Sequence, residues 1–283
     1  MYMASHTNCS ALPLLLLLYL FLIVPPQVLV GARSLNGRGW QSGGATNDSL
    51  CELAVIPQGY KCQEYKVQTE DGYILGLQRI PQGRDSDRES KKRQPVLLQH
   101  GILVDGMSWA LNSPEESLAF ILADNGFDGT LIALSSLSQG KLVDKMKSAA
   151  LLSPIAYLSH ITTPLGNLAA RAFVADVLVR DGVITKYNYG SKTANMKHYN
   201  QVNPPPYNMS NIPKDFPLFL SYGGRDELSD VEDVLQLLDD LKLHDVDKLR
   251  VQYVEEYAHA DFILGINAKA IVYGSIISFF NTH

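Results

Sequence analysis

Basic residues are too few in this 283-residue sequence to provide a positively charged surface: 24 Lys and Arg stand against 29 Asp and Glu, and the formal net charge is −5. A nucleic-acid partner and long-range attraction to an anionic membrane are therefore not expected. Neither G-x-G-x-x-G nor G-x-x-x-x-G-K-[ST] follows a predicted strand, which disfavours a nucleotide-binding domain. The sequence also lacks a metal-ligand cluster and a cofactor motif, so we expect neither a metal nor a cofactor.

A long apolar run, ALPLLLLLYLFLIV, extends from Ala11 to Val24 at the amino terminus. The run has the length of a signal peptide, and Val30 and Ala32 fit the positions before a cleavage site. Residues 1–32 are therefore predicted to be a secretory signal peptide. The alternative, a signal anchor, is disfavoured because prolines interrupt and end the run, so no stable transmembrane segment is expected after cleavage.

Cysteine is scarce, with three residues in the whole chain. Cys9 lies in the predicted signal peptide, which leaves Cys51 and Cys62 as an isolated pair. In an oxidising compartment such a pair is expected to form a short-loop disulfide, the alternative being two reduced, buried thiols. N-x-S/T sequons at Asn47 and Asn208 permit glycosylation in the same compartment.

The mature chain is expected to form one domain, residues 51–283, behind a flexible leader, residues 33–50, that is rich in Gly, Ser and Asn. Two strand-like runs flank Asp71-Gly72, which is a strong hairpin signal. Further on, PVLLQHG reads as a buried strand, and PEESLAFILADNG as a helix that starts at Pro114 and stops at Gly126.

The last third of the sequence repeats the strand–loop–helix pattern twice. FPLFLSYGG is a strand followed by a helix with apolar residues at helical spacing (Val231, Val234, Leu235, Leu238 and Leu241), and KLRVQYV is a strand followed by the helix AKAIVYGSIISFF. Serial units of this kind predict an α/β fold with a mostly parallel sheet flanked by helices. In such sheets the chemistry lies at the carboxyl ends of the strands.

Two side chains with catalytic chemistry follow predicted strands. Asp226 and His259 occur in the chain order in which an α/β-hydrolase presents its acid and its base, and His100-Gly101 after an earlier strand matches an oxyanion loop. Taken singly, Asp226 is equally consistent with a helix cap and His259 with a hydrogen-bonded surface histidine. Their order, together with the His-Gly loop, favours the catalytic interpretation.

Six segments follow one another in an informative order: GYKCQEYKVQTEDGYILGLQRIP, VLLQHGILVDGMSW, FILADNGFD, LLSPIAYLSH, LFLSYGGRDELSDVEDV and EYAHADFILG. From Cys51 onward they resemble the acid lipase family of α/β-hydrolases, which contains the gastric, lysosomal and plant triacylglycerol lipases, and the plant-type members match best. The resemblance implies an acyl-ester or lipid substrate, with Asp226 as triad acid, His259 as base and Ile102 as an oxyanion-hole amide. It also implies an extracellular or a vacuolar or lysosomal location.

The nucleophilic serine of that family is absent. In the family, NGFD is followed by a strand, a long connection and a second strand that ends in G-H-S-x-G, whereas here Asp128 is joined directly to Gly129. No G-x-S-x-G occurs elsewhere in the chain. Ser108 falls in the oxyanion loop, and Ser135 and Ser136 fall on the helix that follows the lost elbow, so neither place offers a strained strand-to-helix turn.

A second internal deletion, near residues 178/179, removes most of the helical cap that covers the acyl pocket in the family. Loss of central strands is expected to leave apolar strands without ladder partners or to force new pairings. The sequence thus predicts a truncated α/β-hydrolase, either an inactive or shortened relative of a secreted lipase or a non-catalytic protein that binds a lipid or a partner.

Overall fold

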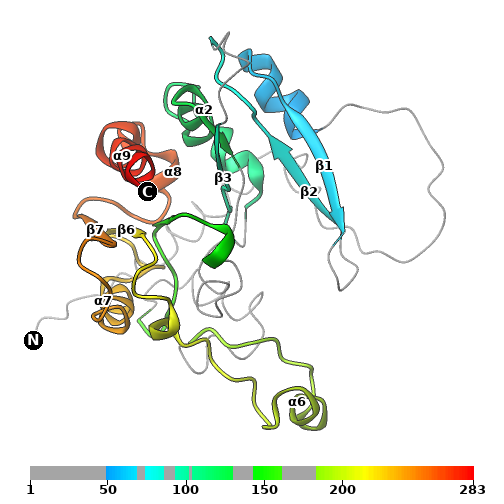
Figure 1. Cartoon of the computed structure of the whole chain (residues 1–283), viewed down its shortest axis with the longest axis vertical. Coiled ribbons are helices and arrows are strands. Elements are labelled where there is room, and N and C mark those ends of the chain that lie inside the picture. Colours follow the sequence, from blue (N-terminus) through cyan, green and yellow to red (C-terminus); the bar gives the residue numbers. More distant parts are fainter. Residues whose placement is uncertain (1–48, 69–73, 86–92, 102–103, 130–142, 161–182) are drawn as a thin grey trace, which may run out of the picture. The chain divides into compact units, whose positions relative to one another are not determined.

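The computed structural model describes residues 49–68, 74–85, 93–101, 104–129, 143–160 and 183–283. These residues belong to one unit, Asn47–His283, in which the elements follow one another as coloured in Figure 1. The predicted signal peptide, almost all of the predicted leader, Asn47, Ile102, Ser135, Ser136 and the 178/179 junction lie outside the described residues.

The amino-terminal part of the unit is a disulfide-linked turn and a hairpin. A π-helical turn, η2 (Cys51–Val55), and a 3-10 turn, η3 (Ile56–Gln58), precede β1 (Gln63–Gln68), which pairs antiparallel with β2 (Ile74–Arg79). The predicted hairpin is confirmed by this pairing, although its turn lies outside the described residues. Cys51 and Cys62 form a disulfide with their Cα atoms 5.5 Å apart, which fixes η2 to the start of β1.

The parallel strands fall into two groups. β3 (Gln94–Val96) pairs with β4 (Phe127–Gly129), and β5 (Ala149–Leu152), β6 (Leu218–Gly223) and β7 (Leu249–Val254) form a second sheet in that order. The predicted parallel arrangement is confirmed. Among the described residues, no ladder joins the two groups.

Strand β3 is shorter than predicted. The sequence favours a buried strand over PVLLQHG, but regular pairing ends at Val96, and Leu97 is exposed. Val96 pairs with Gly129, after which the chain lies outside the described residues until Val143. The residues that follow Val96 up to Gly101 are therefore described as irregular chain and not as strand.

The remaining elements are mostly short. They are η4 (Gly106–Ala110), α2 (Leu118–Asp124), η5 (Val143–Lys145), α6 (Lys192–Tyr199), η6 (Met209–Asn211), α7 (Val231–Asp240), α8 (Asp261–Leu264), η7 (Lys269–Tyr273) and α9 (Gly274–Thr282). Helix α2 begins four residues later than predicted from Pro114, because Ser117 has an extended backbone and acts as its N-cap residue. The apolar spacing over residues 231–241 correctly predicts α7.

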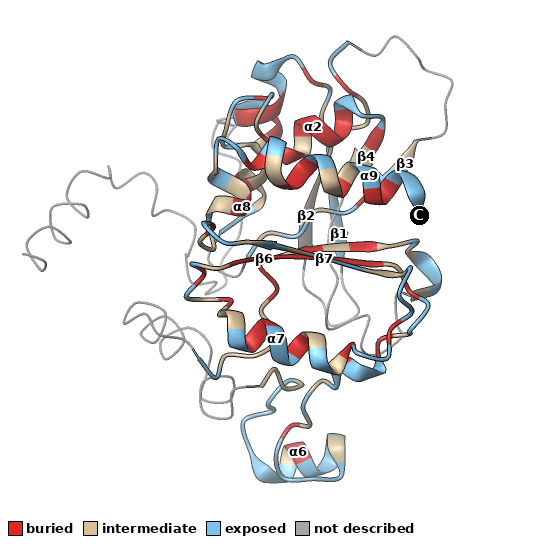
Figure 2. Ribbon diagram, turned by 90° about the vertical axis from the view of Figure 1, so that its left-hand side faces the viewer, coloured by how far each residue is buried: buried red, intermediate tan, exposed pale blue. Residues whose placement is uncertain are grey.

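Strand β6 is buried on both faces and lies between helices. Leu218 and Leu220 pack with Leu237 of α7 on one face, whereas Phe219 packs with Ile276 of α9 on the other. Figure 2 shows α7 and α9 on opposite sides of β6 and β7, with their buried residues turned inward. Each such buried Leu, Ile or Phe side chain contributes about 1.5–3 kcal/mol of hydrophobic free energy. This burial stabilises the layers from which the loops after β6 and β7 extend.

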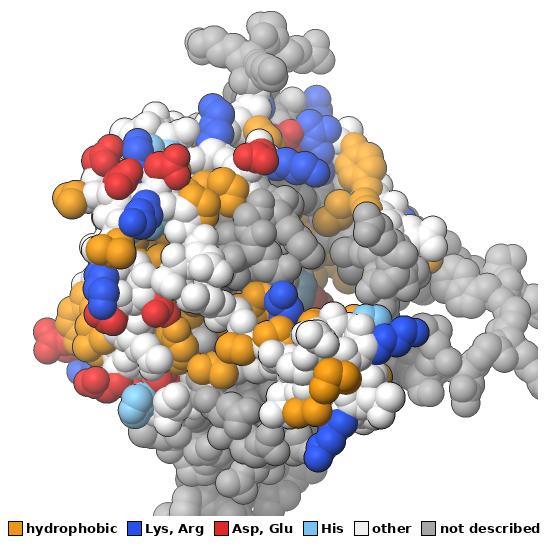
Figure 3. Space-filling model, turned by 60° about the horizontal axis from the view of Figure 1, so that its bottom comes forward, with side chains coloured by type: hydrophobic (Ala, Val, Ile, Leu, Met, Phe, Trp, Pro, Cys, Tyr) orange, Lys and Arg blue, Asp and Glu red, His pale blue; other side chains and the backbone are white. Residues whose placement is uncertain are grey.

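The surface carries both signs of charge. On the face seen in Figure 3, Lys and Arg side chains lie among Asp and Glu side chains and do not gather into one basic patch. None of the helices in the described part of the chain is long and apolar enough to cross a membrane.

Candidate active site

The acid of the predicted pair lies on the turn between β6 and α7. Asp226 is 3% exposed, and its Oδ1 accepts hydrogen bonds from the backbone N–H groups of Leu228 at 2.9 Å and Ser229 at 2.8 Å. These two bonds hold one carboxylate oxygen toward the turn. The other oxygen, Oδ2, is left for a partner from the next strand.

That partner is His259, on the loop that follows β7. Its Nδ1 lies 3.0 Å from Asp226 Oδ2, and its side chain is 39% exposed while the carboxylate is fully buried. Since an ionised carboxylate can only accept, Nδ1 carries the proton in this bond, and Nε2 of a neutral ring is the free acceptor. The arrangement therefore presents a base at the surface and hides the acid behind it.

Two glycines allow the loops to approach each other so closely. A Cβ atom on Gly223 would overlap the carbonyl oxygen of Tyr257, and one on Gly224 would overlap the Glu255 carbonyl oxygen. In the gap that their missing side chains leave, Gly224 N donates to Val254 O and Arg225 N donates to Tyr257 O, both at 3.0 Å. The Gly-Gly pair of the sequence is thus the reason why the chain after β7 reaches Asp226.

The surroundings of Asp226 keep it charged. Burial by itself raises the pKa of this carboxyl group, but the hydrogen bond and charge of His259 and the backbone hydrogen bond from Ser229 act against burial, and the pKa is held below its usual value. An ionised Asp226 fixes the tautomer of His259 and stabilises the imidazolium that forms when the ring takes up a proton.

The predicted oxyanion loop is described only in part. His100 and Gly101 follow β3, and His100 Nδ1 lies 2.8 Å from the carbonyl oxygen of Gly101, whereas Ile102 lies outside the described residues. Ser108, the serine nearest to a nucleophile motif, lies on η4. It is buried, and its hydroxyl donates to the carbonyl oxygen of Asp105 at 2.8 Å, so it is not presented at a strand-to-helix turn.

The structure adds polar residues that the sequence analysis missed. Ser153 and Ser229 border Asp226. A second acid–histidine pair joins Asp233, at the start of α7, to His160, with Asp233 Oδ1 2.8 Å from His160 Nδ1. Serines and a lone histidine have no distinctive spacing in the sequence, so no pattern identifies them. They become apparent only in the structure, where the chain after β5 meets the chain after β6.

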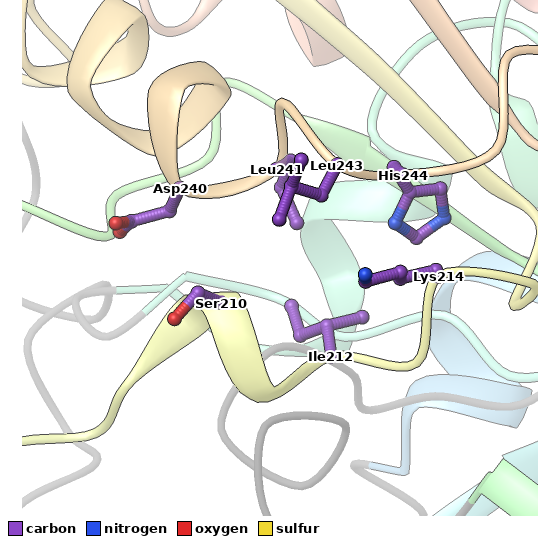
Figure 4. A pocket seen from close by; sticks show the side chains of 7 residues that line it. All are labelled: Ser210, Ile212, Lys214, Asp240, Leu241, Leu243 and His244. Carbon is purple, nitrogen blue, oxygen red and sulfur yellow. The ribbon is translucent and has the colours of Figure 1, made fainter.

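A small pocket lies elsewhere and does not include the pair. Figure 4 shows its lining: Ser210, Ile212, Lys214, Asp240, Leu241, Leu243 and His244. These residues precede β6, or lie at the end of α7 and directly after it, which places the pocket near the amino ends of β6 and β7, whereas Asp226 and His259 follow the carboxyl ends. Within the described residues no group of three or more His, Cys, Asp or Glu could hold a metal ion.

The sequence of the chain is similar to those of known lipases. Residues 53–113 match a family model described as a partial alpha/beta-hydrolase lipase region. The chain is 36% identical to triacylglycerol lipase 2 of Arabidopsis thaliana over 364 positions, covering 82% of this chain and 87% of the relative. It is 26% identical to gastric triacylglycerol lipase of Rattus norvegicus, covering 88% of this chain and 95% of the relative.

Similarity to solved structures is weaker. A soluble variant of monoglyceride lipase from Saccharomyces cerevisiae matches with a TM-score of 0.49 at 13% identity, covering 79% of this chain and 97% of that chain. The alignment with the Arabidopsis lipase is more informative, because its 364 positions exceed the 283 residues of this chain. The relative therefore carries residues that have no counterpart here.

Proposed function

Because the chain belongs to the acid lipase family of α/β-hydrolases, we propose that its site is that of a triacylglycerol or acyl-ester hydrolase in which Asp226 is the acid and His259 the base. The observation that carries this proposal is the 3.0 Å bond between His259 Nδ1 and Asp226 Oδ2 beyond the carboxyl ends of β6 and β7. In a complete site of this kind, His259 Nε2 takes the proton of a serine hydroxyl and later gives it to the leaving alcohol. A backbone amide, assigned to Ile102, stabilises the oxyanion.

The second part of the proposal is that this chain is inactive or nearly so, since the serine that His259 would activate is missing. Asp128 is joined directly to Gly129, and the only elbow-like serine among the described residues, Ser108, donates its hydroxyl hydrogen to the Asp105 carbonyl oxygen. Loss of a triad nucleophile removes most of a roughly million-fold enhancement of kcat. What is left is an acid–base pair without a group to activate.

The domain boundaries of the proposal follow from the same reasoning: a signal peptide at 1–32, a leader at 33–50 and one lipase-like domain at 51–283 with internal deletions near 128/129 and 178/179. The 364 aligned positions of the Arabidopsis relative support the presence of deletions. Within the part of the chain that the structure describes, β3–β4 and β5–β6–β7 share no ladder, which is consistent with a deletion of central strands at the first junction.

Passage through the secretory pathway, to an extracellular or a vacuolar or lysosomal location, belongs to the proposal too. The Cys51–Cys62 disulfide supports an oxidising compartment. Of the two sequons, Asn208 is exposed, and its Oδ1 accepts hydrogen bonds from Ser210 N at 3.1 Å and Ser210 Oγ at 2.6 Å, which leaves its amide nitrogen toward solvent as a glycosylation site. Glycosylation of Asn47 is proposed from its sequon alone.

A non-catalytic role is the second candidate, in which the chain binds a lipid or a protein partner. The absence of the nucleophile combined with an intact Asp226–His259 bond favours it, because the fold around the site persists without the group that performs the chemistry. A lipase-like binder would retain a fatty acid or an unhydrolysed acyl ester without turnover.

One experiment separates the two. The purified chain is incubated with p-nitrophenyl esters of different acyl length and with a fluorophosphonate probe that labels activated serines. No hydrolysis and no labelling, in a chain that still binds an ether analogue of a triacylglycerol, would support the binding role. Hydrolysis with labelling that disappears in the Ser108→Ala variant would overturn the proposed loss of the nucleophile.

A further inference from the structure

Ser153 occupies an unusual position at the carboxyl end of β5. Its φ is +47°, one of two non-glycine positive values among the described residues, and its side chain is 5% exposed. Its backbone N–H donates to the carbonyl oxygen of Ser221 at 2.9 Å, which continues the β5–β6 ladder by one bond beyond the strand. A non-glycine residue is held in this region only where its surroundings fix it, and such positions gather at functional sites.

Ser229 ties the end of β5 to the turn that carries the acid. Its hydroxyl donates to the carbonyl oxygen of Pro154 at 2.8 Å, and its backbone N–H donates to Asp226 Oδ1 at 2.8 Å. Ser229 is 1% exposed, so both bonds are shielded from water. Through this one residue, the segment that follows β5 is bonded to the Asp226 turn.

The Ser153 hydroxyl has no hydrogen bond of ordinary geometry among the described residues. A buried hydroxyl without a partner is costly, so a donor at this position favours a nearby acceptor. Although burial opposes it, the carboxyl group of Asp226 has a pKa below its usual value, and Ser153 contributes to this as a donor.

We propose that Ser229, supported by the strained and buried Ser153 at the end of β5, positions Asp226 from the β5 side and so holds its Oδ2 toward His259. The inference rests on the proposed function, since it takes Asp226 as the acid of the site. In this position the Asp226 carboxylate receives donors from its own turn and from His259. The acid–base pair is therefore fixed by residues that lie outside the missing elbow, which explains why the pair keeps its geometry in this chain.

This positioning role is tested on the full chain by NMR. The ionisation of Asp226 is followed through its carboxyl carbon during a pH titration, and the tautomer of neutral His259 is followed through its ring nitrogens. The variants are Ser153→Ala, Ser153→Gly and Ser229→Ala. The matched control is Ser221→Ala, because Ser221 is a buried serine on β6 whose hydroxyl bonds instead to Gln252 Oε1 at 3.0 Å.

The expected result is a rise in the pKa of Asp226 in the three variants but not in Ser221→Ala. The ratio of the Nδ1–H to the Nε2–H tautomer of His259 should fall by up to about tenfold, the effect of losing one hydrogen bond to a charged group. Ser153→Gly keeps the test valid if other variants unfold, because glycine adopts the positive φ without strain. A role of Ser153 in backbone shape alone would leave Asp226 unchanged in Ser153→Gly.

Failure of the positioning role and failure of the proposed function give different results. If Asp226→Asn leaves the His259 tautomer ratio unchanged, the acid–base pair itself is wrong, and the positioning role is wrong with it. If Asp226→Asn abolishes the preference of His259 for the Nδ1–H tautomer but the Ser153 and Ser229 variants behave like Ser221→Ala, the acid–base pair stands and the positioning role of the two serines is refuted.

Discussion

Arg79 of β2 forms a bidentate ion pair with Asp128 of β4. The Nε atom of Arg79 lies 2.9 Å from both carboxylate oxygens, and its Nη2 atom lies 2.6 Å from Oδ2. Asp128 is mostly buried, with 14% of its side chain exposed. The pair joins the hairpin to the strand that ends at the proposed deletion. It therefore anchors the chain at the place where the family continues into the elbow.

The first prediction is that Asp128→Asn lowers the free energy of unfolding by about 1 kcal/mol. This value is the upper end of what exposed ion pairs contribute to stability, and it applies because Arg79 is partly exposed but binds both carboxylate oxygens. Urea denaturation measures the change. The control is Glu115→Gln, which removes an exposed ion pair with Arg84 at 3.3 Å and should leave the urea midpoint unchanged. Equal effects of the two substitutions would contradict the anchoring role of Asp128.

The second prediction concerns the acid–base pair. A chimera that receives the segment between NGFD and GTLIA from the Arabidopsis relative should hydrolyse acyl esters, because it regains the nucleophile. In this chimera, Asp226→Asn should lower kcat by about 10⁴-fold, since the amide favours the wrong His259 tautomer, and His259→Ala should lower it by orders of magnitude. Asp233→Asn is the matched control on the second acid–histidine pair. Near-normal turnover in Asp226→Asn would mean that the acid has been misassigned.

The third prediction is a pH-dependent contribution of the His160–Asp233 pair to stability. The pKa of His160 is raised, chiefly because Asp233 accepts a hydrogen bond from the ring; this bond and the charges of Asp233, Asp230 and Glu232 together outweigh the opposing effect of desolvation. Because the pKa of the folded state lies above the unfolded value, the contribution is complete below the unfolded pKa of about 6.5 and is lost as pH rises through the folded pKa.

Thermal melting of the native chain and of His160→Gln between about pH 5 and pH 8 measures this contribution. The melting temperatures should differ more at the acid end than at the alkaline end. A difference that does not change with pH would show that the neutral hydrogen bond, and not the charge of His160, provides the stabilisation.

The fourth prediction concerns the disulfide between Cys51 and Cys62, which are separated by 11 positions in the sequence. Replacing both cysteines with alanine should lower the free energy of unfolding by about 2–3 kcal/mol, chiefly because the unfolded chain gains freedom. Denaturation of the native chain with and without a reductant should reproduce the loss. A native chain that is insensitive to the reductant would indicate two reduced thiols.

The fifth prediction is that the native protein contains the Asp128–Gly129 bond. Digestion with an endoproteinase that cleaves before aspartate should release the peptide from Asp128 to Val143, since the next aspartate is Asp144. Mass spectrometry of the protein isolated from its source detects this peptide. Peptides in which NGFD continues into another strand, and GTLIA is preceded by G-H-S, would show that the protein is a complete hydrolase.

Much of the local structure was predictable because it depends on short-range patterns. The apolar spacing of Val231, Val234 and Leu238 predicts α7, and the runs around Asp71-Gly72 predict the β1–β2 pairing. The end of β3 at Val96 was not predictable from PVLLQHG, because the pairing of β3 involves β4, a segment more than thirty residues away. Strand ladders are decided by pairs of segments and not by one segment alone.

By itself, the sequence determined which groups the site contains and which it lacks: an aspartate and a histidine in hydrolase order, and no G-x-S-x-G serine. The tertiary structure decided what those groups do to one another. Only the close approach permitted by Gly223 and Gly224 brings His259 to Asp226, and only the meeting of β5 with β6 lets Ser229 join the segment after β5 to the carboxylate. Chemistry is a property of residue type and can be read along the chain, whereas a bond of 3.0 Å between residues 33 positions apart depends on how the whole layer packs.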